Sequence, residues 1–474
     1  MIAFSDFGAG KMPLHFFEEI SKFPRCSGNS APIADYLVHF AVQRGLAYHR
    51  DTHNNVIIKK PASEGYESRP TVILQGHTDM VMAKNDECSV DMDKEGLLLF
   101  RNGDMLGALG TTLGADNGIA VAYMLALLDD KSAHHPNLEA VFTSDEEIGL
   151  LGAGEINPDW LAGRIMINMD SDREGIFTAG CAGGVRVDLT LPLVRDIEGG
   201  VFYKLEIGGL RGGHSGTEIN SGRENAIKIL ADALSKIPNL RICKICGGNA
   251  DNAIPRSAYC VFTSSVKRTG ELLSIAADAI DPHKKNEEGI YFEITPLTSA
   301  TLPFTEDSSS KIVRLINEVP SGVINMSRDI EGLVETSLNQ GIISASDNTA
   351  CLTVSVRSSK NEERDKLVKR LRSIAERFSA SCQQSGEYPA WEYKRDSHIR
   401  RVMCEIYEKK YGRPPEITVI HAGLECGIFA KKLPGLDCIS IGPDIFDIHT
   451  TEERLSLSSA ERVWIFLLDV LKNI

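Results

Sequence analysis

The chain has 474 residues, 42% of them hydrophobic and 24% charged, a composition typical of a globular protein rather than a disordered or collagen-like chain. Its 65 acidic residues outnumber its 51 basic residues, and the resulting formal net charge of -14 argues against nucleic acid as a partner. The sequence does not open like a signal peptide, and no apolar run reaches the ~20 residues of a membrane span, so no membrane partner is expected.

The first 185 residues alternate between helix-like and strand-like patterns. Apolar residues at three- and four-residue spacing predict amphipathic helices, and short β-branched runs bounded by turn residues predict strands. This alternation predicts an α/β domain with a mostly parallel sheet flanked by helices. In chain order the predicted elements are helices at 12–24 and 31–45, strands at 55–59 and 71–75, a nearly all-apolar helix at 118–129, a strand at 138–143, a helix from about 147 to 154 and a strand at 165–169.

From about residue 185 the pattern changes to successive strands with fewer helices between them. This change favours an inserted α+β domain. The predicted elements are strands at 185–193, 201–207, 291–297 and 351–357, and helices at 225–234, 309–317 and 362–379.

After residue 388 the α/β pattern returns. We therefore expect residues 1–185 and 389–474 to form one domain, into which residues 186–388 are inserted. The predicted elements of the tail are a helix at 397–410, a break at Pro414-Pro415, a Gly-rich turn at 422–427, a strand at 436–441 and an amphipathic helix at 458–471.

Eleven cysteines are scattered along the chain, an odd number that favours a reducing compartment and a cytoplasmic location. Only Cys243 and Cys246 form a CxxC pair. A zinc ribbon would need a second such pair, and a thioredoxin-like motif would need a βαβ context. Because neither accompanies the pair, we interpret both residues as structural thiols.

Polar residues that can bind metals follow several of the predicted strands. Ligands of open α/β sheets bind where the strands end, so side chains at these turns are candidates for one shared site. Taken singly, a histidine after a strand or an acidic pair at a helix start is usually structural, but five such turns in one domain favour a common function. The candidates are His77 and Asp79 after the strand at 71–75, Asp116 ahead of the apolar helix, Glu146 and Glu147 after the strand at 138–143, Asp170 after the strand at 165–169, and His449 near the C-terminus.

This combination of residue types suits a pair of divalent cations. Two cations about 3.5–4 Å apart acidify a bound water and polarise a carbonyl, as amide hydrolysis near neutral pH requires. Asp116, Glu147 and Asp170, together with a hydroxide, balance the charge of the cations. His77 and His449 would bind as neutral imidazoles. Mixed histidine and carboxylate ligands favour zinc, cobalt or manganese.

The carboxylates can be given separate roles. Asp116 lies at a helix N-terminus, and we expect it to bridge the cations with one oxygen facing each. Asp79 lies two residues after His77 and can accept the second N–H of that imidazole, which fixes its tautomer. Glu146 and Glu147 are adjacent and cannot face one atom in the same way. We expect one of them to bind metal and the other to act as general base.

Six motifs of the chain resemble those of the co-catalytic zinc exopeptidases, which include carboxypeptidases, aminoacylases and carnosinases. Two further motifs, His421-Ala-Gly-Leu-Glu-Cys-Gly and Gly180-Cys-Ala-Gly-Gly, resemble the versions found in the aminoacyl-histidine (Xaa-His) dipeptidases of that family. The six motifs are Gln75-Gly-His-Thr-Asp, Leu113-Gly-Ala-Asp-Asn-Gly, Ser144-Asp-Glu-Glu-Ile-Gly, Ile167-Asn-Met-Asp-Ser, Gly212-Gly-His-Ser-Gly and Ile448-His-Thr-Thr-Glu-Glu.

The resemblance implies a role for each candidate and a pair of divalent metal ions, zinc before cobalt or manganese. The catalytic domain would have the fold of the zinc exopeptidases. The implied roles are His77 and Asp170 as ligands of one metal, Glu147 and His449 as ligands of the other, Asp116 as the bridge and Glu146 as general base.

The resemblance also implies that residues 186–388 form a lid of the dimerisation type, which would allow a homodimer. His214, in the Gly-His-Ser motif, would stabilise the oxyanion. Arg357 and Asn252 would bind the C-terminal carboxylate of the substrate, a task that suits an arginine fork. Gly423 would bring backbone N–H groups close to the same carboxylate.

The implied function is that of a metal-dependent dipeptidase. It would hydrolyse small unblocked dipeptides, with a preference for Xaa-His substrates such as carnosine, through attack of a metal-bound hydroxide with Glu146 as base. Two alternatives stay open, an N-acyl amino acid deacylase of the same fold and a non-catalytic peptide-binding relative. A non-catalytic relative would be expected to lack the base or a ligand, and here all are present.

Overall fold

The computed structural model describes residues 8–196 and 200–474, which divide into two compact units. Unit 1 contains the described residues up to Cys181 together with Tyr393–Val419 and Leu424–Ile474. Unit 2 contains Ala182–Glu392 and the short segment Ile420–Gly423. The chain therefore enters unit 2 twice, the second time for only four residues, which no composition change in the sequence had indicated.

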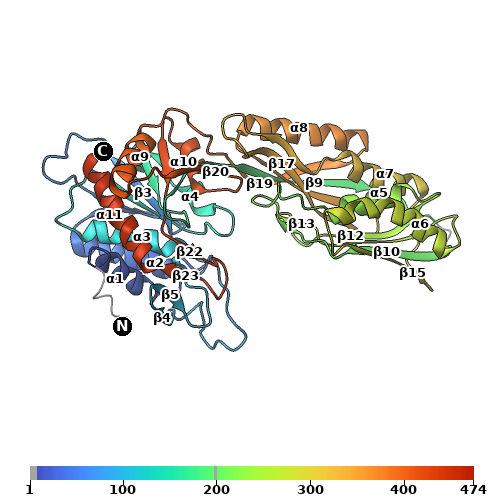
Figure 1. The fold of residues 1–474 in the computed structure, drawn as a ribbon, viewed down its shortest axis with the longest axis horizontal. Helices are drawn as coiled ribbons and strands as arrows, with labels where there is room; N and C mark the ends of the chain where they lie inside the picture. Colours follow the sequence, from blue (N-terminus) through green and yellow to red (C-terminus); the bar gives the residue numbers. More distant parts are fainter. Residues whose placement is uncertain (1–7, 197–199) are drawn as a thin grey trace. The chain divides into compact units, whose positions relative to one another are not determined.

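Unit 1 is built on an eight-stranded sheet in the order β1-β2-β6-β3-β7-β21-β8-β20. Figure 1 labels β3 and β20 of this sheet. The central strands β6, β3, β7 and β21 run parallel, whereas β1, β2 and β8 join antiparallel. The predicted α/β fold is confirmed, with the parallel pairing confined to the middle of the sheet. The strands are β1 Ala47–Arg50, β2 Val56–Lys60, β3 Val72–His77, β6 Leu138–Thr143, β7 Ile165–Asn168, β8 Ile176–Cys181, β20 Glu416–Ile420 and β21 Asp437–Ser440.

Helices cover this sheet, so its central strands are buried along their whole length. A smaller four-stranded sheet has the order β22-β23-β5-β4. Its strands are β4 Leu99–Asn102, β5 Met105–Ala108, β22 Ile445–Phe446 and β23 Arg454–Ser456. The helices of unit 1 are α1 Lys11–Ile20, α2 Ala31–Arg44, α3 Ala115–Asp129, α4 Leu151–Glu155, α9 His398–Tyr411, α10 Glu425–Lys432 and α11 Leu457–Asn473, with a 3-10 turn at Pro158–Trp160.

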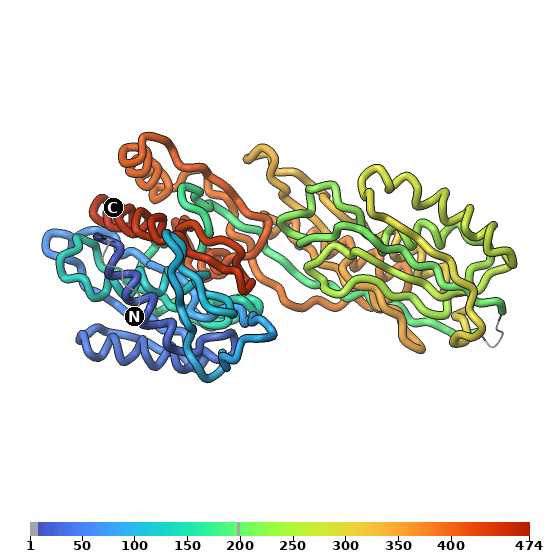
Figure 2. The backbone as a smooth tube through the Cα atoms, turned by 60° about the horizontal axis from the view of Figure 1, so that its bottom comes forward, coloured from blue at the N-terminus to red at the C-terminus, as the bar shows by residue number. Residues whose placement is uncertain are grey.

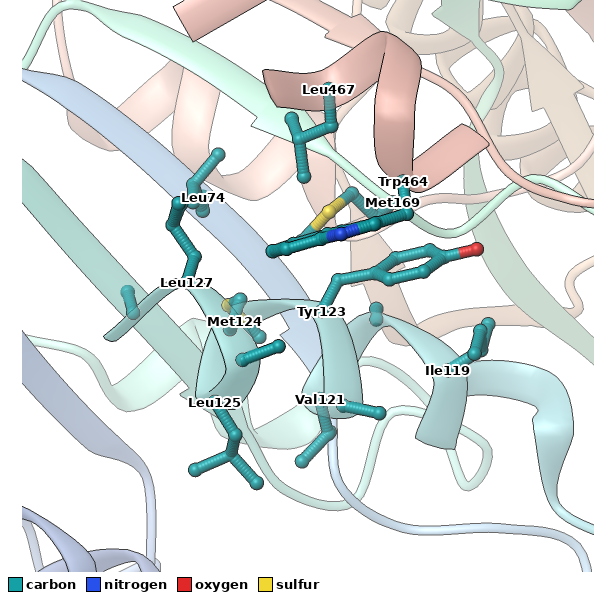
Figure 3. Close-up of a cluster of buried hydrophobic side chains, with 14 of the residues drawn as sticks. Leu74, Ile119, Val121, Tyr123, Met124, Leu125, Leu127, Met169, Trp464 and Leu467 are labelled. Carbon is teal, nitrogen blue, oxygen red and sulfur yellow. The ribbon is translucent and has the colours of Figure 1, made fainter. Parts of the chain in front are cut away.

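Helix α3 is apolar around its whole circumference because it is enclosed on several sides. It contacts β3 and α1, and its Tyr123 ring stacks on Trp464 of α11 with a centroid separation of 6.0 Å (Figure 3). The Tyr123 hydroxyl donates a hydrogen bond to the Ala460 carbonyl at 2.8 Å. Figure 2 shows the C-terminal α11, in red, within the same unit as the blue N-terminal helices. The two ends of the chain thus complete one core.

The helix predicted at 147–154 is wrong in its first half. Residues 146–150 form a turn, and α4 begins only at Leu151. Asp145, Gly149 and Leu150 have positive φ values, which a right-handed helix does not accept. The Gly-rich turn predicted at 422–427 is likewise cut short, because α10 begins at Glu425.

Unit 2 contains a nine-stranded antiparallel sheet in the order β15-β10-β14-β12-β17-β18-β9-β19, with β16 paired to β17. Alternate residues of β9 are buried, as expected for a sheet with one face packed against helices. The strands are β9 Gly183–Pro192, β10 Phe202–Gly208, β12 Arg241–Gly247, β14 Ala258–Thr263, β15 Tyr291–Leu297, β16 Gly322–Met326, β17 Val334–Ala345, β18 Thr349–Ser358 and β19 Ser381–Tyr388.

The helices of unit 2 pack against one another as well as on the sheet, α5 on α6 and α7, and α7 on α8. Cys243 and Cys246 both lie in β12 and are free thiols. No helix in the described ranges is both long enough and apolar enough to cross a bilayer. The remaining elements are a small pair of strands, β11 Gly213–His214 and β13 Ala253–Ile254, the helices α5 Ala226–Ser235, α6 Thr269–Ile280, α7 Glu306–Glu318 and α8 Asn361–Arg377, and a 3-10 helix at Asp281–Lys285.

Candidate metal centre and substrate-binding residues

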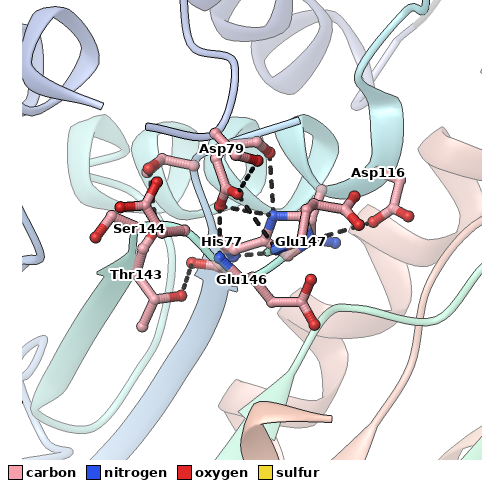
Figure 4. A network of polar contacts seen from close by, with 12 residues as sticks. His77, Asp79, Asp116, Thr143, Ser144, Glu146 and Glu147 are labelled. Atoms are coloured by element: carbon pink, nitrogen blue, oxygen red, sulfur yellow. Dashed lines mark hydrogen bonds and ion pairs between the residues drawn. The ribbon is translucent and has the colours of Figure 1, made fainter. Parts of the chain in front are cut away.

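The predicted metal ligands of unit 1 come from turns that follow its central strands. His77 is the last residue of β3, Glu147 lies in the turn after β6, and Asp170 follows β7. Because these strands are parallel neighbours, their carboxyl ends lie at the same edge of the sheet. Asp116 joins them from the start of α3, and His449 from the turn after β22. Figure 4 shows the part of this arrangement around His77 and Asp116.

Two groups of three potential ligands share Asp116. In the first group, His77 Nε2 lies 3.2 Å from Asp116 Oδ1 and 3.4 Å from Asp170 Oδ1. In the second group, His449 Nε2 lies 3.3 Å from Asp116 Oδ2 and 3.0 Å from Glu147 Oε1. Each oxygen of Asp116 therefore faces a different histidine.

These separations fit divalent cations. Two ligand atoms that each lie about 2.0–2.1 Å from one tetrahedral zinc ion are roughly 3.3 Å apart, close to the nitrogen–oxygen distances of both groups. The donors are imidazole nitrogens and carboxylate oxygens, the set that zinc, cobalt and manganese accept. The residues present can thus hold two such ions, one in each group.

Asp79 supports the site through several hydrogen bonds. His77 Nδ1 lies 3.0 Å from the Asp79 carbonyl oxygen and 3.4 Å from its Oδ1, so both face the second nitrogen of the imidazole. The Asp79 carboxylate also accepts the backbone N–H groups of Glu146 at 3.1 Å and Glu147 at 3.3 Å. Ser27 Oγ donates to the same carboxylate at 2.7 Å. Asp79 therefore orients the histidine and the acidic turn together.

Glu146 and Glu147 differ in their surroundings. Glu147 faces His449, as described above. Glu146 belongs to a third group of potential ligands with His77 and Glu147, so its carboxylate also reaches the centre. The positive φ of Asp145 turns the chain sharply just before this pair, and the Gly28 N–H holds the Asp145 carboxylate at 2.7 Å.

In unit 2, His214 is held in one tautomer. Its Nδ1 accepts backbone N–H groups from Gly216 at 3.3 Å and Thr217 at 3.2 Å. An imidazole whose Nδ1 accepts hydrogen bonds carries its proton on Nε2, which is then a donor. Asn252 is exposed on the adjoining strand connection, where its carbonyl accepts the N–H of Ser215 at 2.8 Å.

The other two predicted substrate residues of unit 2 meet at Tyr388. Arg357 Nη1 donates to the Tyr388 hydroxyl at 2.8 Å, and the Arg357 side chain is buried, with no partner for its Nε atom. At Gly423 a Cβ atom would lie 2.7 Å from the Tyr388 ring, so only glycine fits beside this ring. The neighbouring His421 lies with its Nε2 2.7 Å from Ser337 Oγ.

A comparison with protein families decides what the chain is. The model of peptidase family M20/M25/M40 matches residues 73–473, which include most of the chain and all of the turns that carry the candidate ligands. The chain belongs to peptidase family M20/M25/M40. The predicted family and the predicted peptidase class are thereby confirmed.

Individual M20 relatives resemble the whole chain. The cytosol non-specific dipeptidase of Escherichia coli strain K12 is 35% identical over 467 residues, which cover 97% of this chain and 96% of the relative. The crystal structure of aminoacylhistidine dipeptidase from Vibrio alginolyticus is 36% identical, has a TM-score of 0.89, and matches 98% of this chain and 96% of that chain. The aminopeptidase PepT structure from Bacillus cereus shares the fold, with 16% identity, a TM-score of 0.58, and coverage of 98% of this chain and 99% of that chain.

The two histidines of the candidate metal centre have raised pKa values. Burial would lower the pKa of His77, yet the carboxylates of Asp170 and Asp116 raise it well above its ordinary value. Hydrogen bonds with Asp116 and Glu147 raise the pKa of His449 to about 10. A metal ion that binds these imidazoles competes with their protons.

The pKa values of the carboxyl groups in the candidate metal centre are shifted in different directions. Burial raises the pKa of Asp170 to about 6 and raises the pKa of Glu146 well above its ordinary value. Burial acts on Asp116 in the same sense, but its hydrogen bonds with His449 and His77 hold its pKa well below the ordinary value. These shifts favour the charged form of the Asp116 carboxylate and the protonated form of Glu146.

A buried polar network that was not predicted from the sequence lies next to the candidate metal centre. Glu425 Oε2 accepts hydrogen bonds from Gln75 Nε2 at 2.5 Å and from Thr143 Oγ1 at 2.6 Å, and burial raises the pKa of Glu425 to about 8. Asn168 Nδ2 donates to Gln75 Oε1 at 2.6 Å. The available signal was a polar residue near the end of each apolar strand, as at Gln75 two residues before His77.

Proposed function

We propose that this M20 peptidase is a dinuclear metal-dependent dipeptidase that hydrolyses unblocked dipeptides and prefers a C-terminal histidine. The single observation that carries the proposal is the pair of ligand groups that share Asp116. The substrate class is supported by two relatives of about one-third identity over nearly the whole chain, one described as a non-specific dipeptidase and the other as an aminoacylhistidine dipeptidase.

In this proposal each ligand group holds one cation. His77 and Asp170 bind the first, Glu147 and His449 bind the second, and Asp116 bridges them. Zinc fits these donors, and cobalt or manganese would fit them too. When bound, the two cations would supply an acidified water and a polarised carbonyl.

Glu146 acts as the general base. Its raised pKa suits a group that accepts a proton from the attacking water and then gives it to the leaving nitrogen. The water oxygen forms a bond to the peptide carbon, the C–N bond breaks, and a carboxylic acid and an amine result. Asp79 keeps the Glu146 turn in place by accepting its backbone N–H.

His214 supplies a hydrogen bond to the carbonyl oxygen as negative charge develops on it. The Nδ1 contacts leave the Nε2 proton free for this task. Burial and the nearby charge of Arg357 lower the pKa of His214, which keeps the imidazole a neutral donor.

Arg357, Asn252 and Gly423 recognise the free C-terminal carboxylate. The buried Arg357 fork is oriented by Tyr388 and keeps its Nε atom without a partner, which favours an anionic ligand. The exposed Asn252 side chain and the backbone of Gly423 add neutral donors. Unit 2 would then serve as the lid predicted for residues 186–388.

The proposed substrate class is tested with a panel that contains carnosine, Gly-His, other dipeptides and N-acetyl amino acids. Metal-depleted protein is assayed before and after addition of zinc, cobalt or manganese. We expect hydrolysis of dipeptides only after metal addition, with Xaa-His substrates among the best. Hydrolysis of N-acetyl amino acids alone would contradict the dipeptidase assignment and favour a deacylase.

A cytoplasmic location and a homodimer complete the proposal. The first is supported by the free thiols of Cys243 and Cys246 and by a relative described as a cytosol enzyme. The second is supported by the edge strand β19, which pairs with β9 along one side only among the described strands. Light scattering of the purified protein tests the dimer, and a mass near 51.9 kDa would contradict it.

A further inference from the structure

Two buried charged residues outside the ligand groups contact the turns that carry the ligands. Arg25 follows α1, and Glu453 lies four residues after His449. Their exposed fractions are 1% and 3%. Neither residue belongs to the proposed catalytic machinery, and a buried charge needs a compensating contact to be tolerated.

Glu453 binds the turn that leads into Asp116. Its Oε2 accepts the backbone N–H groups of Leu113 at 2.9 Å and Gly114 at 2.8 Å. Its Oε1 accepts the N–H of Asp116 itself at 3.2 Å. One carboxylate therefore fixes the backbone on which Asp116 is presented, and it does so from the segment that carries His449.

Arg25 binds a carbonyl group of the same turn. Its Nη2 donates to the Gly114 carbonyl at 2.5 Å, and its Nη1 donates to the Thr78 carbonyl at 3.1 Å, one residue after His77. Burial lowers the pKa of Arg25, and Glu453 is the strongest of the charges that oppose this shift. The guanidinium thus links the His77 turn to the Asp116 turn.

The Leu113-Gly-Ala-Asp-Asn-Gly motif is shaped to admit this guanidinium. A Cβ atom at Gly114 would lie 2.5 Å from Arg25 Nη2, and a Cβ atom at Gly118 would lie 2.6 Å from the same nitrogen. Such contacts are far inside van der Waals distance, so a side chain at either position would displace Arg25. The buried arginine leaves no room for a side chain at either glycine, and Gly114 in addition has a positive φ of 64°.

We infer that Arg25 and Glu453 are positioning residues that set the separation of the two metal sites by fixing the backbone of the Asp116 turn. The inference rests on the proposed bridging role of Asp116. This one pair of side chains connects the segments that carry three proposed ligands from distant parts of the chain, His77, Asp116 and His449. Residues of this kind typically change metal affinity 10- to 100-fold when altered.

The test is Co²⁺ binding, followed by the visible absorption of the bound ion, in Arg25→Met, Glu453→Gln and the double variant. Each single variant should raise the Co²⁺ dissociation constant about 10- to 100-fold. In Glu453→Gln an NH₂ group would replace one of the acceptors that the three backbone donors need. Because both residues act on one turn, the double variant should lose less than the product of the two single losses.

Glu139→Gln is the matched control. Glu139 is also a buried carboxylate that accepts backbone N–H groups, from Ala162 at 3.0 Å and Gly163 at 3.0 Å, and it contacts Lys59 at 3.3 Å. It lies near the start of β6, away from the turn at the strand's end. This variant should lower the melting temperature and leave Co²⁺ affinity unchanged.

Arg25→Lys is the alternative variant if Arg25→Met fails to fold. It keeps the positive charge but lacks the two guanidinium nitrogens that donate to Gly114 and Thr78, so it should also bind Co²⁺ more weakly. Folded Arg25 and Glu453 variants that bind Co²⁺ as tightly as the unaltered protein would overturn the inference.

Asp116→Asn separates this result from a failure of the proposed metal centre. If Asp116→Asn loses Co²⁺ while the other variants retain it, only the positioning roles are wrong. If Asp116→Asn also retains Co²⁺, the bridging assignment is wrong as well.

Discussion

The Nε2 atoms of His77 and His449 lie against opposite oxygens of one carboxylate, at 3.2 and 3.3 Å. The two histidines are separated by most of the chain, and the carboxylate between them is that of Asp116. A carboxylate held in this way can bridge two cations at the 3.5–4 Å spacing typical of dinuclear hydrolases. In the proposed dinuclear centre, a substitution of Asp116 would therefore affect both cations.

Replacement of Asp116 by asparagine should therefore remove both metals. Asp170→Asn should remove one equivalent only, because Asp170 belongs to a single ligand group. The metal-to-protein ratio after dialysis, measured by inductively coupled plasma mass spectrometry, checks both expectations. Two equivalents in purified Asp116→Asn would contradict the shared bridge.

Glu146→Ala should keep its metals and lower kcat at least ~10²-fold, because the proton from the attacking water loses its acceptor. Steady-state hydrolysis of Gly-His and metal analysis of the same sample check this prediction. Glu155→Ala, at the exposed end of α4, is the control and should retain normal turnover. A kcat near that of the unaltered enzyme would refute the role of Glu146.

Stabilisation by metal should grow with pH. The pKa of His449 is raised from an ordinary 6.5 to about 10, and that of Asp170 from 3.8 to about 6. A raised folded-state pKa means that the folded form binds the proton more tightly, so the stability gained is complete below the ordinary pKa and lost as pH rises through the folded-state value. Metal-free protein should therefore lose the stability contributed by protonated His449 as pH rises from 6.5 to about 10. It should lose the stability contributed by protonated Asp170 as pH rises from 3.8 to about 6.

Metal ions replace these protons, so the rise in Tm on adding Co²⁺ should be larger at about pH 8.5 than at about pH 6.5. Differential scanning fluorimetry with Co²⁺ or with a chelator measures the difference. Asp116→Asn serves as control and should show little Co²⁺-induced shift at either pH. An equal shift for the unaltered protein at both pH values would speak against proton displacement.

Arg357→Met should weaken binding of dipeptides that have a free carboxylate. Hydrogen bonds to charged groups contribute about 1.5–3 kcal/mol, which corresponds to a rise in KM of roughly 10- to 100-fold. Dipeptide amides should show no such change, because they carry no carboxylate. Arg186→Met, on neighbouring β9 with its Asp188 partner, is the control. Equal losses for acids and amides would contradict the proposed contact.

Much of the fold and the ligand turns could be predicted because their causes are local. The alternation of strands and helices is visible in the hydrophobic pattern, and ligand residues at the ends of parallel strands meet at one edge of a sheet wherever the strand order brings them together. His77 and Asp170 illustrate this, since β3 and β7 are direct neighbours. The antiparallel edges of the sheet were not predicted. The pairs β2–β6 and β8–β21 join segments that lie far apart in the chain, and the short β1 was not expected as a strand.

The supporting residues could not be predicted because their roles depend on tertiary contacts. Arg25 directly follows the helix predicted at 12–24, and nothing in the neighbouring sequence indicates that it reaches Gly114. Glu425 looked like part of a glycine-rich turn, although its carboxyl group is buried beside Gln75. The first half of the helix predicted at 147–154 was wrong for a related reason, since the contact of the Glu147 N–H with Asp79 holds a turn in its place.

The most direct test of the proposed dinuclear centre is anomalous diffraction at the zinc edge from crystals of the zinc-loaded protein. A dinuclear centre should give two anomalous peaks about 3.5–4 Å apart, one on each side of the Asp116 carboxylate. One peak should lie within ligand distance of His77 and Asp170, and the other within ligand distance of Glu147 and His449. A single peak, or two peaks that do not share Asp116, would contradict the dinuclear centre.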